Sequence, residues 1–211
     1  MIIIILGPQG SGKGTQGKKL AEYLKLPFIS AGEMLRDEAL TGSALGKRIH
    51  EIINVQGQLV SPEVITDLFD ARLKQDDAKS GVVIDSYPRD LQQYALMKAR
   101  FVPDVIVVLD LSDAEAVQRL GGRRQCSKGH IYHLEFNPPK QEGVCDVDGS
   151  ALFLRDDDRE EAIRTRLGWH RGKTEPMIEA MANDGMRVVH VDGSLSIDEA
   201  QMAIRFALGV S

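Results

Sequence analysis

The sequence predicts an α/β fold, in which helices flank a five-stranded parallel sheet and a phosphate-binding loop (P-loop) follows the first strand. Three observations predict it. Short apolar segments alternate with segments of helical pattern, as in a parallel sheet that is covered on both faces. A glycine-rich stretch, Gly7–Thr15, stands directly behind the apolar run Met1–Leu6. The 211 residues suffice for one domain with a well-buried core and an insert.

The expected strands are the short apolar segments, and the expected helices are the amphipathic segments between them. In the first of these helices, Leu20, Ala21 and Leu24 recur at the spacing of one helix face. The strands are Ile2–Leu6, Phe28–Ile29, Val82–Asp85, Val105–Leu109 and Arg187–Val191. The helices are Thr15–Leu24, Gly32–Leu40, Ala44–Val55, Pro62–Lys74, Leu91–Ala99, Asp113–Leu120 and a segment from about Arg159 to Ala182.

One region, Gly122–Asp158, interrupts the alternation. It is rich in glycine, proline and charge, and it contains two short β-like pieces, His130–Leu134 and Ala151–Leu154. Such a composition between two helical segments indicates an inserted subdomain.

Composition narrows the classes of ligand. A net charge of −5 argues against a general nucleic-acid binder, and no apolar run approaches the ~20 residues of a membrane span. Met1–Leu6 is too short for a signal peptide, and two cysteines imply no disulfide framework, so we expect a cytoplasmic protein. Arginines nevertheless crowd the stretch 119–171, which indicates either a small anionic ligand or a solvated helix face. They are Arg119, Arg123, Arg124, Arg155, Arg159, Arg164, Arg166 and Arg171.

The stretch Gly7–Thr15 has the features of a loop that holds a nucleotide phosphate tail. Glycines permit unusual dihedral angles and a close approach, and the N-terminus of the next helix adds partial positive charge. Lys13 would reach the terminal phosphates. The stretch departs from the usual pattern because Gly14 stands between Lys13 and Thr15. A chance glycine turn is the alternative, which the preceding strand and the following amphipathic helix disfavour.

Two further charged residues stand at the same edge of the expected sheet. Asp85 ends the strand Val82–Asp85, where its carboxylate could hold Mg²⁺ through water. Arg89 follows after a short turn with Pro88, which suits bidentate recognition of a phosphate. The alternatives are a turn-forming carboxylate and an exposed salt bridge.

At these residues the chain resembles the adenylate kinases, or more broadly the nucleoside monophosphate kinases. The resemblance covers nearly the whole chain and is more specific than a P-loop alone. Its matching stretches are GPQGSGKGTQ, SAGEMLRDE, GQLV, DSYPR, GGRR, YHLEFNPP, LRDDDREEAIRTRL and VDG. It implies a single kinase domain over 1–211, with an acceptor-binding subdomain at 30–60 and a mobile lid at 122–158. It also implies transfer of phosphate from MgATP to AMP. We further expect a monomer, with no nucleic-acid or membrane partner.

The resemblance assigns the ATP side. Lys13 would hold the phosphates, which Gly10, Ser11, Gly12, Gly14 and Thr15 would cradle with their backbone. Arg119, His133 and Phe136 would flank the base, where Tyr132 would also bind. His190 would offer its backbone to the base, with exposure at the strand end as the alternative. Arg123, Arg155 and Arg166 resemble the arginines that close over the transferring phosphoryl group, with Asp157 and Asp158 orienting them.

The resemblance also assigns the acceptor side. Arg36 and Arg89 would bind the AMP phosphate, with Arg155 and Arg166 nearby, and Gln93 would hydrogen-bond the base. Backbone contacts would come from Gly57, Gln58, Leu59 and Val60.

Two residues of the acceptor side depart from the adenylate kinase pattern. Ala31 stands where threonine is usual, as in UMP/CMP kinases, and Ser86 replaces a usual glycine, where its Cβ could require a different backbone dihedral. Gln93 and the long lid favour AMP. A UMP/CMP kinase and a non-catalytic ATP-binding sensor are the alternatives.

The lid segment carries four potential metal ligands, Cys126, His130, Cys145 and Asp148, at the spacing C-x3-H-x14-C-x2-D. This resembles the metal-bearing lids of some bacterial adenylate kinases, with His130 substituting for a cysteine. Structural zinc sites use four such ligands. The alternatives are two unrelated reduced cysteines or a polar lid held by hydrogen bonds.

Overall fold

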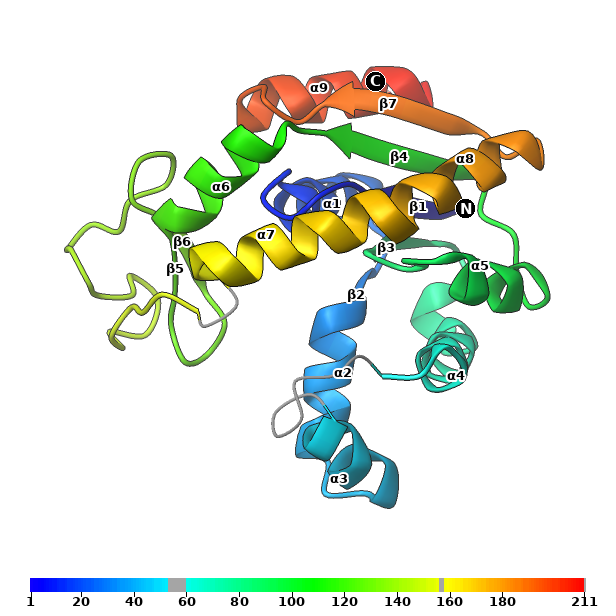
Figure 1. Ribbon diagram of the computed structural model, residues 1–211, viewed down its shortest axis with the longest axis horizontal. Helices are drawn as coiled ribbons and strands as arrows, with labels where there is room; N and C mark the ends of the chain where they lie inside the picture. The colour runs from blue at the N-terminus through cyan, green and yellow to red at the C-terminus, as the bar shows by residue number, and fades with distance from the viewer. Residues whose placement is uncertain (53–59, 156–157, 211) are drawn as a thin grey trace.

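The computed structural model describes residues 1–52, 60–155 and 158–210, and within these ranges five parallel strands form one sheet (Figure 1). The spatial order is β2-β3-β1-β4-β7. The strands are β1 (Ile2–Leu6), β2 (Phe28–Ser30), β3 (Val82–Asp85), β4 (Val105–Asp110) and β7 (Val188–Asp192). The predicted sheet is confirmed, and every strand boundary lies within one residue of its expected position.

The strand register decides which side chains meet at the carboxyl edge. β1 is central because β3 and β4 pair with its two sides, and its residues Ile3–Leu6 are buried. Asp85 of β3 is level with Ile5 of β1 and with Ser30 of β2. The P-loop, Asp85 and the start of the following helix therefore share one edge of the sheet.

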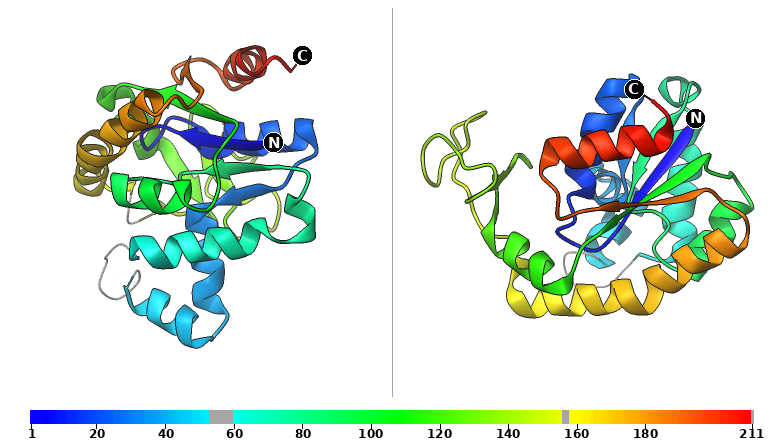
Figure 2. Two further views of the ribbon diagram at one scale, coloured as in Figure 1. Left: turned by 90° about the vertical axis from the view of Figure 1, so that its right-hand side faces the viewer. Right: turned by 90° about the horizontal axis from the view of Figure 1, so that it is seen from above.

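Helices cover both faces of the sheet (Figures 1 and 2). On one face, α1 and α9 pack Leu20, Ala21 and Ile204 against the odd-numbered residues of β1. On the other face, α4, α5 and α8 contribute Phe69, Met97 and Met181. The helices are α1 (Lys13–Leu24), α2 (Ala31–Leu40), α3 (Ala44–His50), α4 (Pro62–Leu73), α5 (Leu91–Lys98), α6 (Asp113–Gly122), α7 (Glu160–Trp169), α8 (Glu175–Asn183) and α9 (Ile197–Leu208), with a 3-10 turn at Asp76–Ala78.

Three helical segments differ from the sequence prediction. α9 was not predicted, although Ser196 and Glu199 form a capping box at its start and Gly209 ends it in a left-handed conformation. The predicted helix from 159 to 182 is broken by a π-helical turn, His170–Thr174, which precedes Pro176 in α8. Proline lacks the N–H of the regular α-helical ladder, which favours such an irregularity. The predicted helix Ala44–Val55 is α-helical only to His50, and 53–55 lie outside the described residues.

Two parts project from the sheet and its helices (Figure 1). The helices α2 and α3 form one arm. The other is the segment between α6 and α7, where β5 (Arg123–Gln125) pairs antiparallel with β6 (Ile131–His133). A small core of Cys126, Tyr132 and Cys145 holds this segment together. None of the helices in the described ranges combines the length and the apolar character that a membrane crossing requires.

Candidate functional site

The P-loop joins the buried strand β1 to α1 through a tight path that requires glycine. Gly12 has φ 87°, and a Cβ on Gly7 would collide with the Leu109 carbonyl. α1 begins at Lys13, and its first turn carries no acidic side chain. The free N–H groups of this turn and the helix dipole therefore create a site for an anion.

Lys13 lies where several positive charges converge. Its Nζ donates to the Pro8 carbonyl at 2.7 Å, so the side chain folds back over the loop. Loss of hydration lowers the pKa of Lys13 to about 8, an effect that Asp85 opposes and that Arg89, Arg166 and Arg123 increase. The structure thus brings together four of the predicted cations. Such an assembly is electrostatically unfavourable until a polyanion enters.

Asp85 is the predicted Mg²⁺ carboxylate, and the structure buries it beside the P-loop. Its side chain is held on one side, because Oδ1 accepts a 2.8 Å hydrogen bond from the Ser86 hydroxyl. Its Oδ2 points to the start of α1, since a Cβ on Gly14 would lie 3.9 Å from it. A carboxylate oxygen next to a phosphate-binding helix start fits Mg²⁺, which prefers oxygen ligands and keeps several waters.

The turn from Ser86 to Arg89 aims a guanidinium at the same edge. Ser86 has φ 63°, so this residue adopts the left-handed conformation that glycine favours, at a typical cost of about 1 kcal/mol. The backbone path therefore stays that of a glycine despite the added Cβ. Arg89 Nε donates to the Ser86 carbonyl at 2.9 Å, and the Arg89 carbonyl accepts from Thr174 Oγ1 at 2.8 Å.

Two of the residues that are expected on the acceptor side, Arg36 and Gln93, lie near Arg89. Part of the Arg89 side chain is exposed. Loss of hydration around the guanidinium has the largest effect on the pKa of Arg89 and lowers it. Asp85 raises this pKa, and Arg36 lowers it further. The Arg89 N–H donates to Gln93 Oε1 at 2.9 Å, which leaves the amide nitrogen of Gln93 as its donor group. Ala31 and Val60 are buried. Gly57, Gln58 and Leu59 lie outside the described residues.

Two of the arginines that are expected to close over the phosphoryl group meet at one buried carboxylate. Arg123 binds Asp158 through two hydrogen bonds of 2.6 and 2.5 Å, and the Asp158 side chain has no exposed surface. Arg166 Nη1 lies 3.8 Å from Asp158, and its Nη2 contacts Gln9 Oε1. The Arg155 carbonyl accepts from the Asp158 N–H at 3.0 Å. The expected second carboxylate, Asp157, lies outside the described residues.

Arg119, His133 and Phe136 form a second cluster, at the junction of α6 and β6. The Arg119 guanidinium lies 5.7 Å from the Phe136 ring centroid, and the rings of His133 and Phe136 are 4.4 Å apart. His133 Nδ1 accepts from the N–H groups of Glu135 and Phe136, so Nε2 carries the proton and donates to the Arg119 carbonyl at 2.9 Å. Burial lowers the pKa of His133, which keeps the ring neutral.

Sequence reasoning missed the loop that Arg119 holds. Its guanidinium donates to the carbonyls of Gly193 and Ser194 at 2.6 and 3.0 Å. This places the VDG motif beside the Arg119 cluster, although the motif's role could not be read from its residues. Gln9, which contacts Arg166, was missed as well.

Two residues expected at the ATP base have their side chains elsewhere. His190 pairs with Asp110 at 2.9 Å and lines a cavity of about 810 Å³ between β4, β7 and α8. Carboxylates rim this cavity, so it does not suit phosphates. Tyr132 is buried in the core of the inserted segment, where its hydroxyl accepts from the Asp146 N–H at 2.7 Å. Any contact of Tyr132 with ATP is therefore left to its backbone.

The four potential zinc ligands do converge. The donor atoms of Cys126, His130, Cys145 and Asp148 all lie within 4.8 Å of one another. His130 Nδ1 is 3.2 and 3.3 Å from the two sulfurs, and 3.4 Å from Asp148 Oδ2. The other oxygen of Asp148 accepts from the Ser150 N–H and hydroxyl, which orients the carboxylate. This donor set and its supporting hydrogen bonds fit a closed, structural zinc site.

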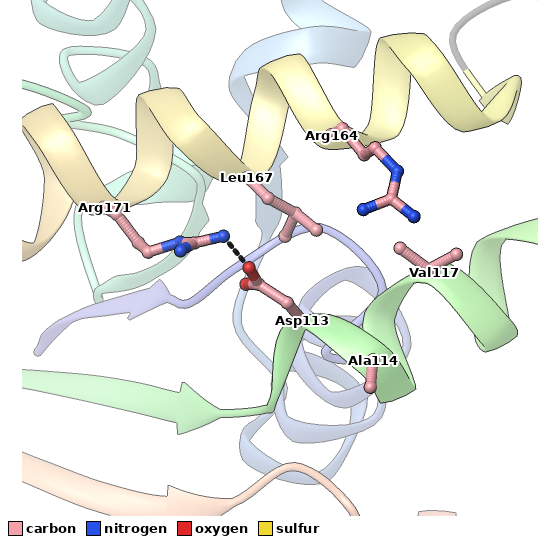
Figure 3. A pocket seen from close by; sticks show the side chains of 6 residues that line it. All are labelled: Asp113, Ala114, Val117, Arg164, Leu167 and Arg171. Atoms are coloured by element: carbon pink, nitrogen blue, oxygen red, sulfur yellow. Dashed lines mark ion pairs between the residues drawn. The ribbon is translucent and has the colours of Figure 1, made fainter.

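A smaller pocket, of about 380 Å³, lies between α6 and α7 (Figure 3). Leu167 and Val117 form its apolar wall, and an ion pair between Arg171 and Asp113 closes one end. None of the predicted site residues lines this pocket. The arrangement links the two helices that lead into and out of the inserted segment.

Known proteins resemble this chain over nearly its full length. A family model described as adenylate kinase matches residues 5–186. An adenylate kinase of Methanococcoides burtonii is 39% identical over 203 residues, which are 94% of each chain. One of Methanosarcina barkeri is 38% identical over 99% of this chain and 98% of its own. One of Agathobacter rectalis is 40% identical over 99% of this chain and 100% of its own.

Proposed function

Because the chain belongs to the adenylate kinase family, we propose that its P-loop edge binds MgATP and AMP end to end and makes two ADP. The enzyme is a nucleoside monophosphate kinase, a phosphotransferase. The observation that carries the proposal is the convergence of Lys13, Arg89, Arg123 and Arg166 beside Asp85. Phosphoryl transfer asks the protein mainly for positioning and for charge stabilisation, and this cluster supplies both.

On the ATP side, the N–H groups of residues 10–15 would cradle the phosphates, and Lys13 would turn from the Pro8 carbonyl to a phosphate oxygen. Adenylate kinases use Mg²⁺ with ATP, and here Asp85 would hold its hydration shell. When bound, the metal would neutralise charge on the phosphates. Arg119, His133 and Phe136 would flank the base, next to the loop at Gly193 and Ser194.

On the acceptor side, Arg36 and Arg89 would bind the AMP phosphate, with Arg155 and Arg166 nearby. The Arg89 N–H holds the Gln93 side chain through its oxygen, so the amide nitrogen of Gln93 would donate to the base. The segment 57–60, Ala31 and Ser86 would line the rest of this pocket. Residues 30–60 would form the acceptor-binding subdomain of a kinase domain that covers 1–211.

The segment 122–158 would act as a lid over both nucleotides. Arg123, within this segment, pairs with Asp158 at its base, and Arg166 of α7 lies next to the same carboxylate. Both guanidiniums would therefore face the phosphates when the segment closes. With Arg155, they would stabilise the equatorial oxygens of the transferring group. The closed lid would exclude water, which would otherwise hydrolyse ATP. Zinc bound by Cys126, His130, Cys145 and Asp148 would be structural.

The family and the net charge of the chain support a proposal for its location, oligomeric state and partners. We propose a cytoplasmic monomer that uses small-molecule nucleotides, without a nucleic-acid or membrane partner.

The test of the function is ADP production from MgATP with AMP, UMP, CMP or GMP as acceptor. We expect the highest kcat/KM with AMP. Faster turnover with UMP or CMP would mean that the preferred acceptor is a pyrimidine monophosphate. Turnover with none of the four would refute the proposed phosphoryl transfer.

A further inference from the structure

Ser86 makes three contacts that link the two halves of the proposed active site. Its N–H donates to the Ile5 carbonyl at 3.1 Å, which fixes it to the central strand. Its hydroxyl donates to Asp85 Oδ1 at 2.8 Å, and its carbonyl accepts from Arg89 Nε at 2.9 Å. One residue thereby orients both the carboxylate on the metal side and the guanidinium on the acceptor side.

The conformation of Ser86 indicates that its side chain has a use. Its φ of 63° is disfavoured for a residue with a Cβ, whereas glycine would adopt it without strain. Glycine would also keep both backbone contacts. The hydroxyl contact with Asp85 is therefore the one interaction among the three that serine adds and glycine could not make.

The hydroxyl determines which carboxylate oxygen of Asp85 is available. Oδ1 is occupied by Ser86, while Oδ2 faces the start of α1 at Gly14, where the phosphates would lie. Asp85 is also buried, with 8% of its surface exposed, so water competes little for the hydrogen bond from Ser86. Partners of this kind typically orient a ligand group and strengthen metal binding.

We infer that Ser86 is a positioning residue, whose hydroxyl holds the Asp85 carboxylate with Oδ2 turned toward the hydrated Mg²⁺ of bound ATP. The inference rests on the proposed function. Ser86 would contact neither nucleotide phosphate nor metal, and its effect would pass through Asp85.

Two substitutions separate the hydroxyl from the backbone strain. Ser86→Ala removes the hydroxyl and keeps the strained Cβ, whereas Ser86→Gly removes both. We expect the melting temperature to fall in Ser86→Ala and to stay higher in Ser86→Gly than in Ser86→Ala, because glycine adopts this backbone conformation without strain. The contribution of Mg²⁺ to ATP affinity, here called metal coupling, should instead decrease alike in both variants, because both lack the hydroxyl.

Metal coupling is measured without turnover, by calorimetric titration with ATP in Mg²⁺ and in excess EDTA. The ratio of the two dissociation constants gives the contribution of the metal. We expect this ratio to decrease by about tenfold in both variants, with the metal-free constant unchanged. Ser196→Ala is the matched control, since Ser196 also donates to a carboxylate, that of Glu199, at 2.6 Å, at the start of α9.

The result that would overturn the inference is a ratio in Ser86→Ala equal to that of the parent, whatever its stability. An equal decrease in Ser196→Ala would overturn it too, because the effect would then not be specific to Asp85. These outcomes differ from failure of the proposed function, which the acceptor assay with the unmodified protein tests.

Discussion

Arg123 and Asp158 form a bidentate ion pair, with distances of 2.6 and 2.5 Å, in which the carboxylate is fully buried. Arg123 lies at the start of the inserted segment and Asp158 at its end, so the pair joins the two ends of that segment. The Arg166 guanidinium lies 3.8 Å from the same carboxylate. One acidic group thus holds in place two of the cations that we assign to phosphoryl transfer.

Replacing Asp158 with asparagine should therefore damage both stability and turnover. Arg123 would keep at most one good hydrogen bond, and we expect a loss of about 2 kcal/mol in the free energy of unfolding. Turnover should fall because the two guanidiniums lose their common anchor. Urea unfolding and the ADP assay measure these effects. Asp77→Asn removes an exposed bidentate partner, that of Arg72, and is the control. A control that lost as much stability would contradict the importance of burial.

Replacing Lys13 with methionine should slow phosphoryl transfer by removing a positioned cation. Groups of this kind typically supply about 3 kcal/mol of transition-state stabilisation, so kcat should fall by roughly two orders of magnitude. Lys19→Met, on the same helix but in an exposed pair with Asp198, should leave kcat unchanged. Equal losses in the two variants would show a general effect of charge.

The lowered pKa of Lys13 also predicts a pH dependence. In the free enzyme its pKa is about 8, so the cation is lost as pH rises through that value. The kcat/KM for ATP reports ionisations of the free enzyme and should decrease above about pH 8. The kcat should fall only at higher pH, because bound phosphates stabilise the cation. A kcat/KM that stays level to pH 10 would disprove the assignment.

Replacing Arg89 with alanine should affect the acceptor far more than ATP. Bidentate contacts to a phosphate are charge-assisted, so we expect AMP affinity to fall by at least about tenfold. ATP affinity should change by less than about threefold, which separate calorimetric titrations would measure. Arg72→Ala removes a guanidinium that pairs with Asp77 away from the site and should change neither. An equal loss of ATP affinity would mean that the two phosphate pockets are wrongly assigned.

The purified protein should contain about one zinc per chain, as measured by elemental analysis. Chelation should lower the melting temperature, since the core of the inserted segment is small and includes the ligands Cys126 and Cys145. Cys126→Ser should unfold earlier and respond little to the chelator. Well under one zinc per chain, with a Cys126→Ser variant as stable as the parent, would leave hydrogen bonds alone as the support of this segment.

Several features could be predicted because they depend on local sequence. The strands are short apolar segments between helical patterns, so the spacing of apolar residues predicted each of them to within one residue. The P-loop could be identified because its glycines meet steric requirements, as at Gly12 with φ 87°. α9 could have been found from its capping box, Ser196 and Glu199, which is a local signal as well.

The contacts between distant segments depend on packing and could not be derived from local sequence. Only the folded chain brings Arg119 to the carbonyls of Gly193 and Ser194, and turns Tyr132 into the core of the inserted segment. The sequence by itself determined the sheet, the phosphate loop and the charges available to the site. The tertiary structure decided which charges meet, because the distances between side chains from separate elements depend on how those elements pack. Ser86 illustrates this difference. The serine itself was visible in the sequence, whereas its left-handed backbone and its hydrogen bond to Asp85 depend on the folded chain.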